Sequence, residues 1–167
     1  SFAASAFDVL AALRVLGKHS QIDADRISAQ GHSRGGTAVL LSAMRTFADP
    51  IVGPERSFRG VYAVYPWCGH QFSVPNTGET KIRAIVGERD DWLSVQQVQA
   101  QIQAIKLSGC SASIQIVKGA SHSFDREEAL HEIPEASVTP QAPTVYLGPS
   151  GEMIHPVTGT ADISLTD

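Results

Sequence analysis

The chain has 167 residues, a formal net charge of −4 at pH 7 and 43% hydrophobic residues. This length fits one domain with a substantial buried core. The acidic balance and the lack of a basic patch argue against a nucleic-acid partner, and no apolar run approaches the length that spans a bilayer. Two cysteines, Cys68 and Cys110, do not decide the redox compartment. For Cys68 we expect a buried, unreactive thiol.

The first predicted element is a helix that ends at Gly17. Five residues at helical spacing should form its buried face: Ala3, Ala6, Phe7, Leu10 and Leu13. A strand that begins at Ile27 follows this helix. The next helix is apolar nearly all round through Phe47, so we expect it to be deeply buried.

The remaining elements continue the alternation of strands and helices. Strands are predicted over 60–65, over 82–86 and around Ile114, where apolar and polar residues alternate as in a half-buried edge strand. A helix should begin at about Ser94 with a capping box, inward-facing aliphatic residues and glutamines that face water. This alternation predicts right-handed crossovers and a parallel sheet. Beyond Pro134 we expect loops with room for a hairpin.

One run, Gly31-His32-Ser33-Arg34-Gly35, places a serine between two glycines, after a strand and before a helix. This is the G-x-S-x-G nucleophile-elbow pattern in the context that it requires. The turn is tight, so side chains at the two flanking glycine positions should collide with their neighbours. Ser33 is therefore the candidate nucleophile, and a glycine-rich turn with an exposed serine is the alternative.

A serine hydroxyl is a weak nucleophile at neutral pH, so it needs a base, and the base needs an orienting acid. Asp90 and Asp91 lie in a carboxylate-rich loop after the strand at 82–86, at the edge where sites form on open α/β sheets. Glu88 is a weaker third candidate, because it is nearer the strand end. The alternative for all three is a solvated turn carboxylate.

The candidate base is His122, which stands in a loop of small residues after the strand around Ile114. A histidine on a loop can reach across to a serine, whereas a histidine inside an element usually cannot. The segment from Asp125 to His131 should be helical, with acidic residues in its first turn.

The other five histidines carry weaker predictions. His70 could line a pocket, and His32 should pack away from the Ser33 side chain. Surface positions are expected for the rest: His19, His131 and His155. No pair of histidines, cysteines or acids has metal-ligand spacing, so we expect neither a metal nor a cofactor.

Three motifs together resemble those of the dienelactone hydrolase-like branch of the α/β-hydrolases: residues 31–36, 87–92 and 119–124. The resemblance spans nearly the whole chain and implies a mostly parallel sheet with helices on both faces. It also implies a triad of Ser33, Asp90 and His122, in the chain order of that fold, with the Arg34 backbone N–H as an oxyanion donor. Enzymes that open dienelactones carry cysteine as nucleophile, so a serine here points to the wider set of esterases in this branch.

The activity that this resemblance implies is cleavage of a small-molecule carboxylic ester through an acyl-enzyme intermediate. Candidate substrate-binding residues are His32, Trp67 and Trp92. For the Arg34 side chain, a structural ion pair is favoured over contact with a substrate carboxylate. A serine peptidase or acyltransferase with the same triad, and a non-catalytic binding protein of this fold, remain alternatives.

By the same resemblance, residues 1–167 form a single α/β-hydrolase domain that is incomplete at both ends. About four strands should precede the first helix, and they include the loop that supplies the second oxyanion donor. The N-terminal segment is thus an expected partner of this chain. Alone, the chain should show little esterase activity and should aggregate. The cellular compartment stays undetermined.

Overall fold

The computed structural model describes residues 1–136, 138, 140–155 and 157–161, and its centre is a sheet of four parallel strands. The strands are β1 (Ser28–His32), β2 (Gly60–Val64), β4 (Lys81–Gly87) and β5 (Ala112–Val117), in the order β1-β2-β4-β5. Ala29, Val61, Ile82 and Ala112 lie side by side in register across the sheet. Because all four strands run the same way, their carboxyl ends meet at one edge.

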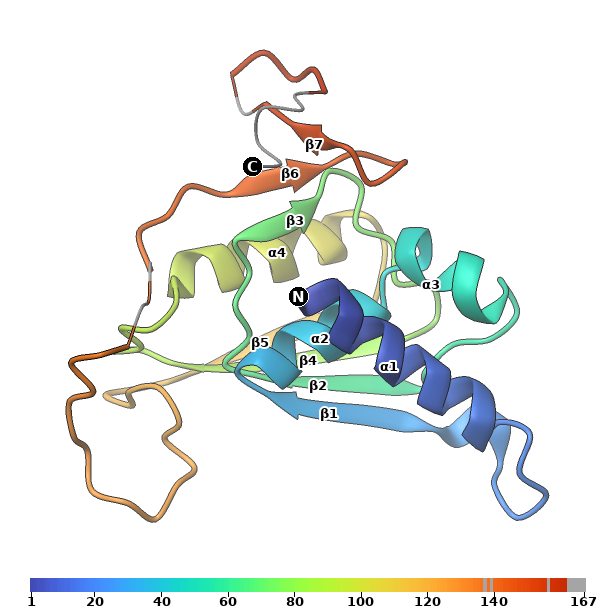
Figure 1. Cartoon of the computed structure of the whole chain (residues 1–167), viewed down its shortest axis with the longest axis horizontal. Helices are drawn as coiled ribbons and strands as arrows, with labels where there is room; N and C mark the ends of the chain where they lie inside the picture. Colours follow the sequence, from blue (N-terminus) through green and yellow to red (C-terminus); the bar gives the residue numbers. More distant parts are fainter. Residues whose placement is uncertain (137, 139, 156, 162–167) are drawn as a thin grey trace.

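Four helices cover one face of this sheet: α1 (Phe2–Leu16), α2 (Arg34–Ser42), α3 (Arg45–Val52) and α4 (Val95–Leu107). A short 3₁₀ turn, η1 (Ala24–Arg26), precedes β1. In Figure 1 the helices lie on the same side of the strands, with α2 against β1 and β2, α4 against β4 and β5, and α1 packed on α2. The predicted α/β class and parallel sheet are confirmed, but the helices expected on both faces lie on one side of the sheet among the described residues.

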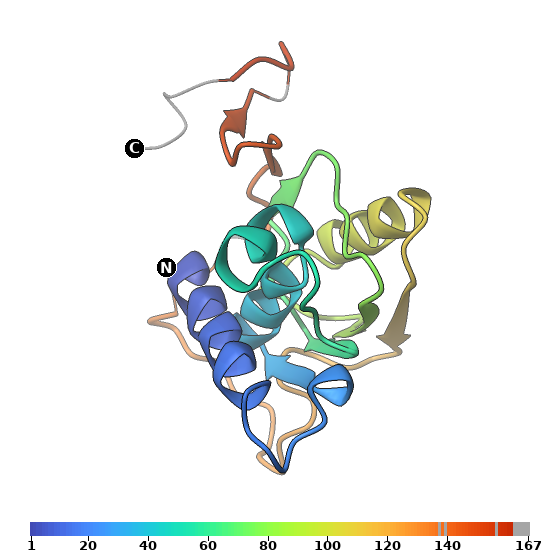
Figure 2. The ribbon, with the colours of Figure 1, turned by 90° about the vertical axis from the view of Figure 1, so that its right-hand side faces the viewer.

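A second, three-stranded sheet lies on the side of the helices away from the main sheet (Figures 1 and 2). It consists of β3 (His70–Phe72), β6 (Val145–Leu147) and β7 (Met153–Ile154). Beyond Pro134, where a hairpin was considered, strands β6 and β7 form an antiparallel hairpin. The parallel pairing of β6 with β3 was not predicted. That pairing joins segments more than 70 residues apart, and no local pattern marks it.

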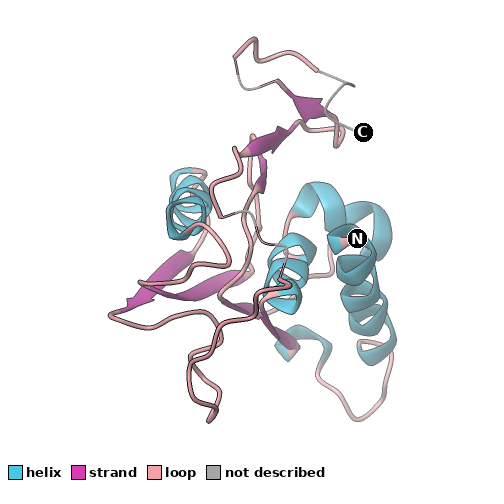
Figure 3. Cartoon of the chain, turned by 60° about the vertical axis from the view of Figure 1, so that its left-hand side comes forward, coloured by secondary structure: helices cyan, strands magenta, loops and turns pink. Residues whose placement is uncertain are grey.

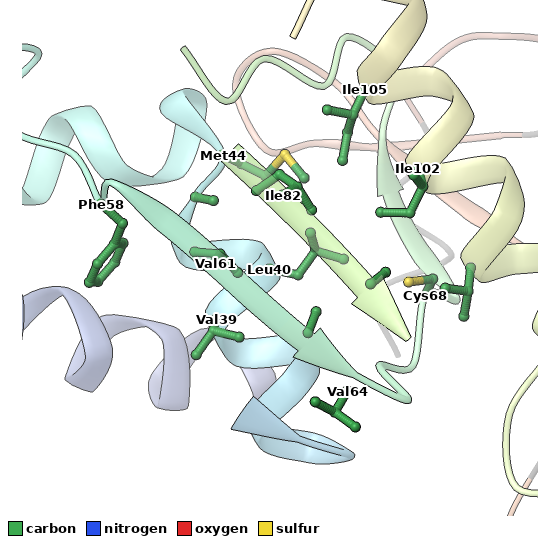
Figure 4. Packing of buried hydrophobic residues seen from close by; sticks show 14 of the residues in the cluster. Val39, Leu40, Met44, Phe58, Val61, Val64, Cys68, Ile82, Ile102 and Ile105 are labelled. Carbon is green, nitrogen blue, oxygen red and sulfur yellow. The ribbon is translucent and has the colours of Figure 1, made fainter. Parts of the chain in front are cut away.

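The hydrophobic core lies between the main sheet and the helices (Figure 4). Leu40 of α2 and Ile102 of α4 point toward Val61 and Ile82, and all four side chains are almost fully buried. Burying an aliphatic side chain of this size contributes about 1.5–3 kcal/mol, so this layer holds the strand ends in place. Within the described part of the chain, no helix is long and apolar enough to cross a bilayer.

The two N-terminal helices differ from their predicted form. In α1 only the stripe of Ala6, Leu10 and Leu13 is buried, and Ala3 and Phe7 are exposed. This helix rests on other helices rather than on the sheet, so a narrower face is covered. The helix predicted through Phe47 instead ends at Ser42, as α2, and α3 starts anew at Arg45. The break follows from the Arg45 N–H, which donates to the Asn76 carbonyl at 2.8 Å.

Two predictions in the second half of the chain are also corrected. Helix α4 has half of the predicted capping box: the Ser94 hydroxyl accepts from the Gln97 N–H at 3.3 Å, but the Gln97 side chain is bonded to the tail instead. Gln97 and Gln101 are buried rather than facing water. The Gln97 amide donates to the carbonyl of Ala142, which ties the tail to this helix.

The helix predicted from Asp125 to His131 does not form. Figure 3 shows the chain that leaves β5 as loop, and every residue from Asp125 to His131 is exposed. A seven-residue helix with no buried face has too little packing to offset the cost of nucleation. The segment that follows His122 is therefore an extended excursion from the body of the molecule.

Candidate active site

Ser33 lies at the junction of β1 and α2, in a strained backbone conformation with φ of +52° and ψ of −117°. Its N–H donates to the Val64 carbonyl of the neighbouring strand at 2.9 Å, which fixes the turn to the sheet. A Cβ at Gly31 would lie 2.2 Å from the Gly35 carbonyl oxygen, and a Cβ at Gly36 would lie 2.7 Å from that of Val64. The turn therefore requires glycine at these two positions.

The prediction for the second flanking glycine, Gly35, was wrong. No atom lies within 4 Å of the place where its Cβ would stand. The close approach to the sheet falls one residue later, at Gly36, because that residue faces β2 across the start of the helix.

Asp90 follows β4 and is the acid that the structure places beside the histidine. Its side chain is fully buried, and its Oδ1 accepts from the backbone N–H groups of Trp92 at 3.1 Å and Leu93 at 3.3 Å. These bonds leave Oδ2 free to face His122. The two other candidates are elsewhere: Asp91 is exposed, and Glu88 accepts from the Gly119 N–H at 2.8 Å.

His122 links the acid to the serine. Its Nδ1 lies 2.8 Å from Asp90 Oδ2, and its Nε2 lies 3.0 Å from Ser33 Oγ. An ionised carboxylate can only accept, so Nδ1 donates to Asp90 and Nε2 is left to accept the serine proton. This is the tautomer in which a neutral imidazole can act as a base toward Ser33.

Two aromatic rings enclose the imidazole of His122. The indole of Trp92 stacks on it, with ring centroids 5.2 Å apart and planes 5° from parallel. The ring of Tyr65 lies 4.6 Å away on a tilted plane. Together they leave the His122 side chain only 9% exposed, so the ring is held between two surfaces as well as by its hydrogen bonds.

The two other candidate substrate contacts lie in different surroundings. Trp67 stacks on Phe2, with centroids 5.0 Å apart, and meets His70 edge-on. Its backbone N–H donates to the Thr37 hydroxyl in α2, which places it near the nucleophile turn. His32 is exposed rather than packed, and its Nε2 lies 3.2 Å from the carboxylate of Asp125.

Arg34 is the first residue of α2, and its backbone N–H is therefore in the turn where such groups have no partner within the helix. This N–H and the positive end of the helix are suited to a developing negative charge near Ser33. The guanidinium donates to the Ser1 carbonyl at 3.3 Å and lies over the ring of Phe2. The ion pair expected for the Arg34 side chain is not found among the described residues.

Sequence reasoning missed one pair of residues beside the site. Tyr65, just beyond β2, has φ of +36°, and its buried phenol donates to Asp125 Oδ1 at 2.6 Å. Burial and this hydrogen bond raise the pKa of Tyr65 to about 12, and the same bond lowers the pKa of Asp125. The only local signal was the position of Tyr65 at the carboxyl end of a strand, where sites form.

The remaining polar side chains were considered as metal ligands and as a second nucleophile. No group of three or more potential ligand side chains gathers among the residues that the structure places. Cys68 is buried, as expected, and burial raises its pKa to about 12. A groove of about 520 Å³ opens beside Asp90 and is lined partly by Glu88 and Asp91, but Ser33 is not on its wall.

Several solved structures share this fold at low sequence identity. Esterase 2 of Thermogutta terrifontis, in its apo form, is 18% identical, with a TM-score of 0.61 over 74% of this chain and 56% of that chain. The L63A variant of SOBER1 from Arabidopsis thaliana is 18% identical, with a TM-score of 0.57 over 72% and 56%. Dipeptidyl peptidase 4 of Porphyromonas gingivalis is 18% identical, with a TM-score of 0.58 over 71% and 20%.

At these identities the likeness shows the fold, and this chain spans little more than half the length of the first two proteins. No curated protein sequence matches the chain at a significant level. A model of the dienelactone hydrolase family matches residues 3–142, a range that contains Ser33, Asp90 and His122. The chain therefore belongs to the dienelactone hydrolase family.

Proposed function

We propose that this chain carries the catalytic residues of a serine hydrolase that cleaves small-molecule carboxylic esters. The observation that supports it is the unbroken series of hydrogen bonds from Ser33 Oγ through His122 to Asp90, at 3.0 Å and 2.8 Å. Nucleophile, base and orienting acid come from three loops at the carboxyl edge of one parallel sheet. Membership in the dienelactone hydrolase family favours the same reading.

In the first step Ser33 Oγ attacks the ester carbonyl while His122 Nε2 takes the hydroxyl proton. Asp90 holds the imidazole in the required tautomer and stabilises its positive charge once it is protonated. The Arg34 N–H donates to the oxyanion of the tetrahedral intermediate. The imidazolium then gives its proton to the alcohol oxygen, the carbon–oxygen bond breaks, and the acyl group stays on Ser33.

In the second step water attacks the acyl-enzyme. His122 takes a proton from that water and returns one to Ser33 Oγ, so the acid leaves and the resting state is restored. The buried carboxylate of Asp90 accepts from two backbone amides besides His122, which keeps it in place through both steps. The stacked indole of Trp92 covers one face of the imidazole throughout.

The test uses an organophosphorus probe and a panel of esters. The esterase from Thermogutta terrifontis has been solved phosphonylated by sarin and with propionate bound, so a fluorophosphonate is a suitable reagent. The complete protein should react covalently with the probe and hydrolyse p-nitrophenyl esters. Ser33→Ala should lose both properties, with a fall in kcat on the order of 10⁴-fold or more.

Ser121→Ala is the matched control, because this serine directly precedes His122 and its hydroxyl forms no hydrogen bond among the described residues. It should label and turn over like the unaltered protein. Labelling that persists in Ser33→Ala would show that another residue is the nucleophile. Faster cleavage of peptide amides than of esters would assign a peptidase with the same triad, and no labelling at all would favour a binding protein.

A further inference from the structure

The loop that carries His122 is bound to the end of β4 before the histidine, where the Arg89 N–H donates to the Ala120 carbonyl at 2.8 Å, but it has little to hold it afterwards. Ser123 has a positive φ of +57°, and all residues from Asp125 to Glu135 are exposed to solvent. The loop contains neither helix nor strand (Figure 3). On the side that follows His122, contacts made by side chains therefore help to set the height and orientation of the imidazole above Ser33.

Asp125 makes the strongest of these contacts beyond His122 itself. One carboxylate oxygen, Oδ1, accepts from the Tyr65 hydroxyl at 2.6 Å, and the other, Oδ2, lies 3.2 Å from His32 Nε2. Hydrogen bonds to an ionised carboxylate are shorter and about twice as strong as those between neutral groups. A single side chain thus ties the histidine loop to the end of β2 and to the nucleophile elbow.

Tyr65 is a rigid anchor for this contact. The residue is 3% exposed, its backbone N–H donates to the Ile85 carbonyl at 2.6 Å, and its ring meets both His122 and Phe124. A non-glycine residue held at positive φ is strained, and such strain persists where the surrounding structure fixes it. The hydroxyl of Tyr65 therefore presents a fixed donor to the loop, three residues beyond His122.

His32 supplies the second attachment, next to the nucleophile. It precedes Ser33 in the elbow, and its imidazole lies 5.8 Å from the ring of Tyr65. Asp125 consequently bridges two residues that both flank the reacting centre. If this bridge is lost, the segment after His122 keeps the packing of Phe124 against Tyr65, and the bonds and stacking of His122 carry more of the task of holding the imidazole in place.

We propose that Asp125 is a positioning residue that latches the His122 loop onto Tyr65 and His32 and so holds the imidazole at attack distance from Ser33. This proposal rests on the triad assigned above. Displacement of a reacting group by about 1 Å can cost a hundredfold in rate. Asp125 acts through His122 and is not in contact with Ser33, so its loss should lower kcat and leave KM nearly unchanged.

The experiment compares Asp125→Ala with Glu127→Gln in the complete protein, using p-nitrophenyl ester turnover and the rate of fluorophosphonate labelling. Glu127 is the matched control, because it is an exposed acid in the same loop and lacks a recorded ion pair among the described residues. We expect Asp125→Ala to lower kcat and the labelling rate between about tenfold and a hundredfold, with KM within twofold. Glu127→Gln should retain the unaltered rates.

Tyr65→Phe removes only the hydroxyl and keeps the ring against His122. It should reproduce most of the loss, and the double variant with Asp125→Ala should be no slower than the slower single variant, because both remove the same bond. The kcat of Asp125→Asn should lie between that of Asp125→Ala and that of the unaltered protein, since an amide oxygen still accepts from Tyr65. Losses that multiply in the double variant, or an unchanged kcat in Asp125→Ala, would overturn the latch.

Each variant is also followed through urea unfolding, which separates a lost fold from a misplaced histidine. If Ser33→Ala abolishes turnover while Asp125→Ala does not alter it, the latch is wrong and the triad stands. If Ser33→Ala keeps full turnover, the proposed function itself fails. If Asp125→Ala alone were too unstable to purify, the split between kcat and KM would be read from Tyr65→Phe and Asp125→Asn.

Discussion

The two sides of the candidate active site are held in place by different means. On the serine side, backbone contacts with the sheet and the start of α2 define the turn. Gly31 and Gly36 approach neighbouring backbone so closely that no Cβ fits, and the Ser33 N–H is bonded to β2. Ser33 therefore belongs to the rigid frame of the fold.

On the histidine side, backbone contacts hold the loop as far as Ala120, and side chains hold the histidine itself. His122 is held by Asp90, by the stacked ring of Trp92 and by the neighbouring ring of Tyr65, and its loop is otherwise exposed beyond Phe124. The comparison teaches that substitutions of the glycines that fix the turn of Ser33 should act on folding. Those on the histidine side should act on catalysis while the fold survives.

The largest effect should come from Gly31→Ala. The new Cβ would lie 2.2 Å from the Gly35 carbonyl oxygen and 2.8 Å from the Gly36 nitrogen, and these backbone atoms cannot yield without moving α2. We expect a loss of about 3 kcal/mol or more in the free energy of unfolding, or failure to fold. Urea unfolding followed by circular dichroism measures it.

Gly35→Ala is the matched control for this prediction, because its Cβ would meet no atom within 4 Å. Alanine is favoured over glycine inside a helix by about 0.5–1 kcal/mol, so the unfolding midpoint of Gly35→Ala should be unchanged or higher. Equal destabilisation by both variants would show that the turn is not limited by the contacts of Gly31.

Trp92→Ala, on the histidine side, should have a smaller effect, and this effect should fall on catalysis rather than on folding. The indole is 36% exposed, so its loss should change unfolding little. It stacks on the imidazole that must become positively charged during the reaction, and a cation–π contact of this kind contributes roughly 0.5–2 kcal/mol. We expect kcat to fall from a few-fold to about thirtyfold, measured with p-nitrophenyl esters.

Trp92→Phe keeps an aromatic face and should recover most of the lost rate. If Trp92→Ala instead lowered the unfolding midpoint strongly and left kcat per folded molecule unchanged, the histidine side would be part of the frame. The distinction between the two sides would then fail.

The same division explains which features could be predicted from the sequence. The elbow and the loop acid are marked by short local patterns, because glycines around Ser33 and a carboxylate after an apolar strand leave a trace within a few residues. The pairing of Tyr65 with Asp125 leaves no such trace, since the two residues are 60 positions apart and meet only in the fold. Local charge even suggested a helix at Asp125, where the exposed chain has no partner to pack against.

The last prediction concerns Tyr65 at alkaline pH. Burial and the bond to Asp125 raise its pKa from the ordinary value of 10.0 to about 12, so the folded state favours the neutral phenol. The resulting stability is fully present below pH 10.0 and is lost as the pH rises through about 12. The unfolding midpoint of the unaltered protein should therefore fall more steeply over this window than that of Tyr65→Phe. All other titrating groups are common to both proteins, so the difference between the two curves isolates this phenol.

Absorbance at 295 nm gives an independent reading, because Tyr65→Phe should lack the ionisation near pH 12. Parallel stability curves, together with three tyrosines that all ionise near pH 10, would show that the phenol is not held by Asp125.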